Sequence, residues 1–185
     1  MHKLCPKGVD VSFNLDNFVT SAREAASQDR ATAAVNELMV RTFANPEEIA
    51  AAIEPFDRDD EPLYEDAHVS IYWVRFDPHV KVPPHNHKIA AFLGVYEGVE
   101  VNELYRKANG GIELVKSKRM EPGVTLSMGA EGIHGVYSEG DSASLGLHIY
   151  LGSLQTVERE LFHPETGEAM AFTDENYQKL VRPLS

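Results

Sequence analysis

Two histidines one residue apart, His85 and His87, are the side chains best placed to do chemistry in this chain. They stand in the segment Pro83-Pro84-His85-Asn86-His87, and an apolar run follows them as far as the turn signal Glu97-Gly98. Because strand side chains alternate between two faces, both imidazoles point to the same side. The proline pair withholds two N–H donors and suits the beginning of a strand better than its middle. The pattern predicts two metal ligands at the start of a buried strand over 89–96.

A third ligand has to come from elsewhere in the chain, and two histidines lie in other predicted strands. His134 follows a glycine-containing turn, and His148 shares a strand face with Tyr150. A lone strand histidine is more often an ordinary core or surface residue. A histidine pair joined to a distant Gly-x-His, however, is the usual composition of a mononuclear transition-metal site. We therefore predict His85, His87 and His134 as the ligands. The remaining histidines are assigned to the surface or to loops: His2, His68, His79 and His163.

The N-terminal part, 1–56, shows helical periodicity from Asn14 onward. Apolar residues recur at three- and four-residue spacing up to Ala25, which predicts an amphipathic first helix. A second helix is expected to begin at the N-cap Asp29. A short third helix is expected to begin at Asn45-Pro46 and to end near Ile53. We interpret these helices as a layer that packs on the rest of the protein.

After a charged loop at 57–61, strand-like composition replaces the helical spacing. About seven short strands with glycine- or proline-containing turns indicate a sandwich or barrel over 57–170. A last helix over 173–180 falls in the C-terminal tail, 171–185. The whole chain, 1–185, is expected to be one domain. The predicted strands span 69–76, 89–96, 99–107, 112–118, 123–128, 133–138 and 144–151.

Composition narrows the class of partner. The formal net charge of −12 argues against nucleic acids and anionic membranes, which need clustered basic residues. No apolar run approaches the roughly 18 residues that a membrane helix needs, and the N-terminus lacks the apolar core of a signal peptide. The single cysteine, Cys5, excludes an internal disulfide framework and is not expected to be catalytic. These features predict a cytoplasmic protein.

The order of these motifs resembles that of the cupins, over about 63–165. A first motif ends in His-x-His and a glycine turn, and a second motif contains Pro122-Gly123 and the later His134. The resemblance implies a mainly β fold, the cupin double-stranded β-helix or jelly-roll barrel, here with an N-terminal helical layer. The usual first motif also supplies a glutamate ligand four or five residues after its second histidine. Those positions hold Ala91 and Phe92, so no carboxylate ligand is available there.

Three histidines without an acid resemble the thiol dioxygenases of the cysteine dioxygenase type. That family also carries a Ser-x-His-x-Tyr element, which stands here as Gly146-x-His148-x-Tyr150. The resemblance implies Fe(II) on the three histidines and a catalytic pair formed by Tyr150 and His148. The substrates would be a small thiol and O2, and the product a sulfinate. Imidazoles also suit Zn, Ni and Cu, so iron rests on the resemblance alone.

By register with the family, the resemblance also implies a substrate pocket formed by inward-facing residues of two strands: Tyr72, Val74, Phe76 and Phe92. Cysteine-specific family members place an arginine just before the first of these strands to bind the substrate carboxylate. The corresponding stretch, 63–68, contains no arginine. The resemblance therefore implies a thiol other than cysteine, one that is less acidic or larger.

Two further hypotheses stay open. A three-histidine cupin can perform carbon–carbon dioxygenation or a lyase or isomerase reaction. The absence of the arginine and serine of the thiol dioxygenases is compatible with this second hypothesis. A cupin can also bind a small ligand without catalysis, for sensing. The His148–Tyr150 pair counts against that last reading.

Overall fold

The computed structural model describes residues 12–108 and 110–184, so Cys5 and His2 lie outside the described part. Helix α1, Leu15–Ala26, begins after Asn14, whose side chain accepts a hydrogen bond from the Asn17 N–H at 2.9 Å. Helix α2, Ala31–Thr42, begins two residues later than the predicted cap at Asp29. Helix α3, Pro46–Ala52, has its proline in the first turn, where no N–H is required. The predicted helical layer is thus present.

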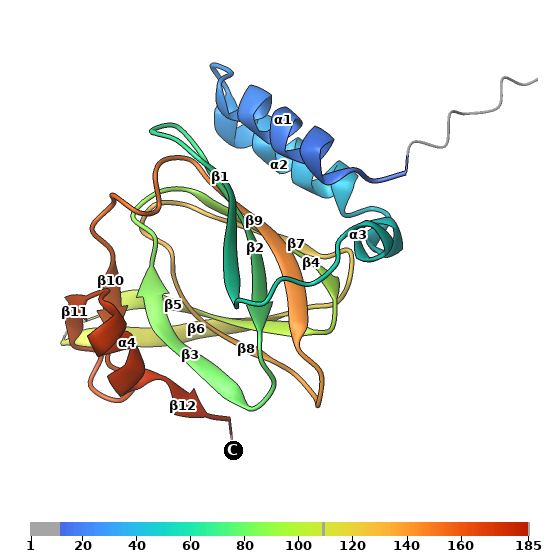
Figure 1. Cartoon of the computed structure of the whole chain (residues 1–185). Helices are drawn as coiled ribbons and strands as arrows, with labels where there is room; N and C mark the ends of the chain where they lie inside the picture. The colour runs from blue at the N-terminus through green and yellow to red at the C-terminus, as the bar shows by residue number, and fades with distance from the viewer. Residues whose placement is uncertain (1–11, 109, 185) are drawn as a thin grey trace, which may run out of the picture.

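The strands form two antiparallel sheets that face each other (Figure 1). Sheet A has the order β1-β2-β9-β4-β7. Sheet B has the order β11-β10-β3-β8-β5-β6, with β12 also paired to β3. Numbered from β2 to β9, the eight central strands give the orders 1-8-3-6 and 2-7-4-5, the two sheets of a jelly roll. The strands are β1 Asp60–Glu65, β2 Ser70–Phe76, β3 Val80–Asn86, β4 Ala91–Glu97, β5 Glu100–Ala108, β6 Gly111–Met120, β7 Thr125–Met128, β8 Ile133–Ser138, β9 Ser144–Tyr150, β10 Glu160–Phe162, β11 Ala169–Ala171 and β12 Arg182–Pro183.

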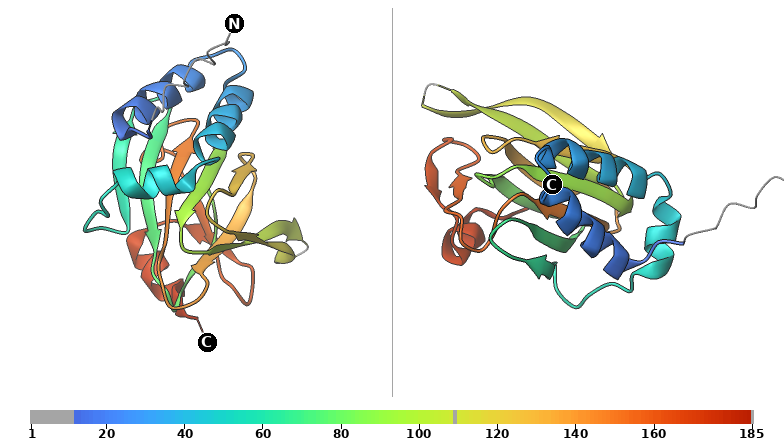
Figure 2. Two further views of the ribbon diagram at one scale, coloured as in Figure 1. Left: turned by 90° about the vertical axis from the view of Figure 1, so that its right-hand side faces the viewer. Right: turned by 90° about the horizontal axis from the view of Figure 1, so that it is seen from above.

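Sheet A has two buried faces. The three N-terminal helices lie over its outer face, as the views from the side and from above show (Figure 2). Residues of β2 and β9 that face the helices, such as Trp73 and Leu147, join one core with helical residues such as Met39. The alternate residues of the same strands, including Tyr72 and Val74, face the interior between the sheets. Each central strand of sheet A therefore separates the helical layer from the interior of the jelly roll.

The histidine pair lies at the end of β3, which corrects its predicted place at the start of a strand over 89–96. Pro83 and Pro84 are inside β3, at the point where its register with β8 shifts between Val82 and His85. Because regular pairing is interrupted there, the missing N–H donors cost no ladder hydrogen bond. A turn then separates β3 from β4, with Lys88 at a positive φ of 56°.

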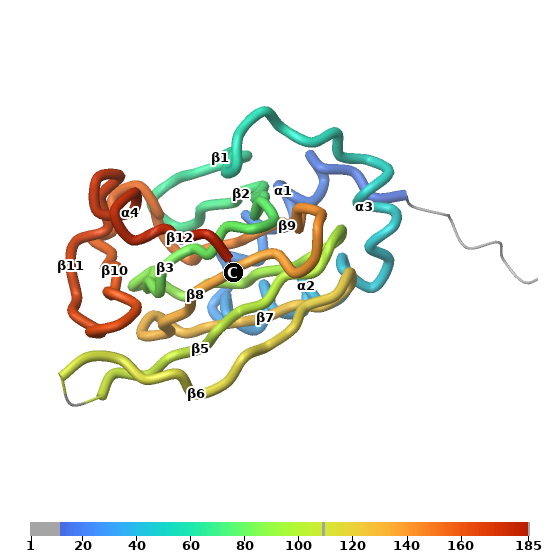
Figure 3. The backbone as a smooth tube through the Cα atoms, turned by 90° about the horizontal axis from the view of Figure 1, so that it is seen from below, coloured from blue at the N-terminus to red at the C-terminus, as the bar shows by residue number. Residues whose placement is uncertain are grey.

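The C-terminal residues extend sheet B at the edge formed by β3. Strand β10 pairs with β3 through Leu161 and His85, and β12 pairs with β3 through Arg182 and Lys81. Helix α4, Asp174–Leu180, agrees with the predicted last helix and lies beside these strands. Seen from below, β3, β8, β5 and β6 follow one another across the sheet, with the C-terminal elements beyond β3 (Figure 3). No helix in the described ranges is both long and apolar enough to cross a membrane.

Candidate metal centre and its cavity

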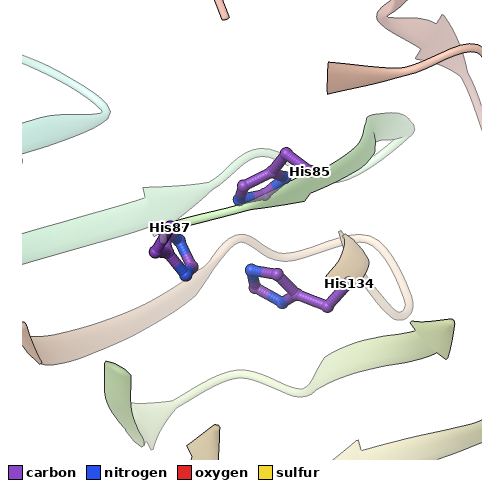
Figure 4. A group of neighbouring side chains, drawn as sticks. All are labelled: His85, His87 and His134. Atoms are coloured by element: carbon purple, nitrogen blue, oxygen red, sulfur yellow. The ribbon is translucent and has the colours of Figure 1, made fainter. Parts of the chain in front are cut away.

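The structure brings His85, His87 and His134 together into one buried group. One nitrogen from each imidazole lies within 4.8 Å of the others, and Figure 4 shows the three rings pointing toward one another. Pairing of β3 with β8 places His85 directly opposite His134, with 4.4 Å between the ring centroids. His87 completes the group just beyond β3, at 5.1 Å from the ring of His134. No Asp, Glu or Cys joins this group within the described residues.

Hydrogen bonds leave the Nε2 atoms of two imidazoles free to bind a metal. The Nδ1 of His85 lies 3.0 Å from the Pro83 carbonyl oxygen, which can only accept, so Nδ1 carries the proton. The Nδ1 of His134 lies 2.7 Å from the Asn102 side-chain oxygen, and the same reasoning applies. The His134 Nε2 is buried and has no partner among the described residues. A buried nitrogen lone pair that accepts no hydrogen bond is available to bind a cation, so these residues fit a metal.

Burial keeps the imidazoles neutral. It lowers the pKa of His85 to about 4 and that of His148 to about 3. The pKa values of His87 and His134 also fall well below their ordinary value, first through burial and then through neighbouring histidines. At neutral pH the site therefore offers uncharged nitrogen donors, the form that binds divalent transition metals.

His148 and Tyr150 lie beside the histidine group as a hydrogen-bonded pair. The His148 Nδ1 and the Tyr150 Oη are 3.0 Å apart, and the Tyr150 ring lies 4.9 Å from that of His87. Gly146 stands where the thiol dioxygenase element has a serine, and a Cβ at this position would approach the Gly94 carbonyl oxygen to 2.5 Å. Ser144 does not replace the absent serine hydroxyl, since its Oγ is buried without a hydrogen-bond partner in the described chain.

A cavity of about 660 Å³ opens in front of these histidines. Tyr72, Val74 and Phe76, which share one face of β2, line it, as the family resemblance implied. The prediction for Phe92 is wrong as to its position. Phe92 packs with the helical layer, because its neighbours Ala91 and Leu93 take the inner face of β4.

Arg159 lines the same cavity and was missed by the sequence analysis. Its guanidinium lies 4.1 Å from the centroid of the Phe172 ring and forms no ion pair with the described residues. Burial lowers its pKa, which nearby Tyr150 partly offsets, and a guanidinium stays charged under these conditions. By contrast, Arg75 at the cavity mouth is paired with Asp59 at 2.7 Å. Arg159 sits in an irregular segment that carries no periodic signal.

Comparison with known proteins gives a likeness of fold. No protein-family model matches the chain, and no match was found among curated proteins. A Klebsiella pneumoniae protein with a double-stranded β-helix domain is 12% identical, with a TM-score of 0.45 over 66% of this chain and 87% of that one. A Bacillus halodurans protein is 15% identical, with a TM-score of 0.48 over 52% and 72%.

An oxalate oxidase is 21% identical, with a TM-score of 0.41 over 46% of this chain and 42% of that one. The chain thus spans less than half of the oxalate oxidase, and 32% of a Solanum melongena vicilin. These likenesses concern the fold alone. The strand order, rather than these scores, identifies the jelly roll, an architecture that cupins share.

Proposed function

We propose that this protein is an iron-dependent thiol dioxygenase whose substrate is a small thiol with an anionic group. The observation that carries the proposal is a set of three neutral, buried imidazoles that faces the same cavity as Tyr150 and Arg159. The reaction adds both atoms of O2 to sulfur, RSH + O2 → RSO2H, and needs no further reductant. When bound, Fe(II) would supply a centre that favours thiolate over thiol and accepts O2.

Three uncharged ligands leave the full charge of a divalent ion uncompensated, because no carboxylate joins the group in the described residues. Such a site favours anionic ligands, in a protein whose net charge of −12 does not attract them otherwise. A thiolate sulfur meets this requirement, because proximity to a cation lowers the pKa of a thiol.

Tyr150 is the group suited to donate a hydrogen bond in the cavity. Burial raises the pKa of its phenol, so the hydroxyl keeps its proton at neutral pH. In the tautomer with its proton on Nδ1, His148 donates to the phenol oxygen at 3.0 Å, and the phenol proton is then free to point at substrate. His148 would act by holding this orientation.

Arg159 supports an anionic substrate and changes the expectation of a less acidic thiol. That expectation came from the absence of arginine in 63–68, whereas this guanidinium enters the cavity from the segment before β10. A cation that forms no ion pair with the described residues can bind a carboxylate by two parallel hydrogen bonds.

Oxygen uptake by the Fe(II)-loaded protein tests the proposal. The panel is 3-mercaptopropionate, cysteine, cysteamine and 2-mercaptoethanol, with the sulfinate product identified by mass spectrometry. We expect a higher kcat/KM for 3-mercaptopropionate, which carries a carboxylate, than for cysteamine or 2-mercaptoethanol. Arg159→Leu should lower the value for 3-mercaptopropionate by about tenfold to a hundredfold and leave that for 2-mercaptoethanol unchanged. The proposal is wrong if iron binds stoichiometrically and no thiol raises oxygen uptake. Retention of iron by His134→Ala would contradict the ligand assignment.

A second candidate is a three-histidine metal protein with a different reaction, such as carbon–carbon dioxygenation, or a lyase or isomerase reaction. The size of the cavity, about 660 Å³, favours it, since a small thiol fills only part of that volume. Oxygen consumption with a non-thiol substrate, or turnover without oxygen consumption, would support this candidate over the first.

A further inference from the structure

The segment 85–88, which carries two of the proposed metal ligands, also contacts Glu160 through the side chains that point away from the metal site. His85 and His87 face the metal site, whereas the intervening Asn86 and the following Lys88 contact Glu160. The Asn86 Nδ2 donates to a Glu160 carboxylate oxygen at 2.7 Å, and the Asn86 Oδ1 accepts from the Glu160 N–H at 2.9 Å. The Lys88 Nζ lies 2.8 Å from the same carboxylate. We call Asn86, Lys88 and Glu160 the clasp.

The clasp fixes the residue next to Arg159. Strand β10 begins at Glu160, and its next residue, Leu161, pairs with His85 in β3. The backbone carbonyl of Arg159 accepts a hydrogen bond from the Phe172 N–H at 2.9 Å. The Phe172 ring in turn lies 4.1 Å from the Arg159 guanidinium and 5.5 Å from the ring of His85. Arg159 is therefore tied to the ligand-bearing strand by its neighbour, its backbone and its side chain.

We infer that Asn86 and Glu160 are positioning residues that set the separation between the histidine group and Arg159. They thereby select thiols by the number of carbons between sulfur and the anionic group. The inference rests on the proposed function, in which sulfur binds at the histidines and the anion at Arg159. Asn86 is 1% exposed and both of its amide atoms are bonded, so it has no freedom to adjust. A displacement of 1 Å at such a site can cost about a hundredfold in rate.

A pair of near-isosteric substitutions tests the clasp. Asn86→Asp keeps the acceptor for the Glu160 N–H but places a carboxylate oxygen against the Glu160 carboxylate. Adding Glu160→Gln restores a donor and an acceptor across the same contact. Dissociation constants would be measured by calorimetry on anaerobic Fe(II)-loaded protein, with mercaptoacetate, 3-mercaptopropionate and 4-mercaptobutyrate as probes.

We expect one chain length to bind best to the wild-type protein. Asn86→Asp should reduce this preference by about tenfold, and the double variant should return it to within about twofold of wild type. Lys107→Gln is the matched control, because the Lys107 Nζ lies 3.7 Å from Glu160 at the surface. That variant should keep the wild-type preference.

The iron content of each variant shows whether a changed preference comes from loss of the metal or from a displaced Arg159. If Asn86→Asp loses iron, Glu160→Ala replaces it, since Glu160 is outside the ligand segment. An unchanged chain-length preference in an iron-loaded clasp variant would overturn the inference. Failure of the wild-type protein to bind any of the three thiols would instead sink the proposed function, before any variant is compared.

Discussion

The orientation of His134, one of the three proposed ligands, depends on a chain of buried polar groups. Asn102 accepts from its Nδ1 at 2.7 Å and donates its own amide protons to Glu100 at 2.6 Å and to the sulfur of Met120 at 3.2 Å. Burial raises the pKa of Glu100 to about 7, so its carboxyl is partly protonated at neutral pH. Asn102 thus fixes which nitrogen of His134 carries the proton, and so which nitrogen can bind a metal.

Asn102→Ala should therefore weaken metal binding while leaving all three ligands in place. We expect a loss of about tenfold to a hundredfold in affinity, the usual effect of removing a hydrogen-bond partner of a ligand. Titration with Co²⁺, followed by its visible absorption, measures this loss. Asn36→Ala, at an exposed position of α2, is the control and should bind as wild type does. Equal affinity in Asn102→Ala would show that packing alone orients His134.

At the scale of elements, strand β4 joins the helical layer to the jelly roll. Gly94 lies on its outer face, where an added Cβ would come within 2.4 Å of the Phe43 ring. Phe43 is fully buried at the C-cap of α2. The absence of a side chain at Gly94 thus allows an aromatic ring to pack directly on the strand backbone.

Gly94→Ala should destabilise the protein by about 1–3 kcal/mol through overpacking against this ring. Urea unfolding at neutral pH measures the change. Gly129→Ala is a suitable comparison, because a Cβ there meets nothing within 4 Å and the residue has no positive φ. Similar free energies of unfolding for the two variants would contradict the proposed contact between β4 and α2.

The elements predicted from the sequence are those with strong periodicity. Strand alternation groups Tyr72, Val74 and Phe76 on one face of β2, which is regular from Ser70 to Phe76. The family resemblance selected that face as the inner one, and all three residues line the cavity. The expectation for Phe92 was wrong although alternation itself holds, because the inner face of His85 and His87 continues through Ala91 and leaves Phe92 on the outer face of β4. Arg159 could not be predicted, because its place depends on β10 pairing with β3, a contact between segments 70 or more residues apart.

At the scale of the whole molecule, the part of the chain that the structure describes holds four buried histidines and one buried carboxylic acid of raised pKa. Unfolding exposes all of them, and they then titrate at ordinary values. The four histidines take up protons on unfolding below about pH 6.5, which destabilises the folded state as pH falls. Glu100 has the opposite effect on stability, because the folded state binds its proton from about pH 7 downward, before the unfolded state does.

The metal-free protein should consequently lose stability steeply between pH 6.5 and about 4, the folded-state pKa of His85. The unfolded state binds about four more protons on histidine and one fewer on Glu100, a net uptake of about three. The free energy of unfolding should therefore fall by on the order of 4 kcal/mol per pH unit in the steepest part. Urea unfolding at pH 7.5, 6.5 and 5.5 checks this slope. His148→Phe should lower this slope by the contribution of about one proton. A free energy of unfolding that is constant over this range would contradict the burial of neutral imidazoles.

The chain has a single tryptophan, and its position makes it an optical reporter of how the two layers separate. Trp73 is fully buried on the outer face of β2, packs on Phe56 and donates its indole N–H to the Tyr96 hydroxyl at 2.7 Å. If the layer that covers sheet A lifts, water reaches this indole and its emission shifts to longer wavelength. A fluorescence transition that precedes the loss of β-sheet circular dichroism would mean that the helices detach first from an otherwise intact jelly roll.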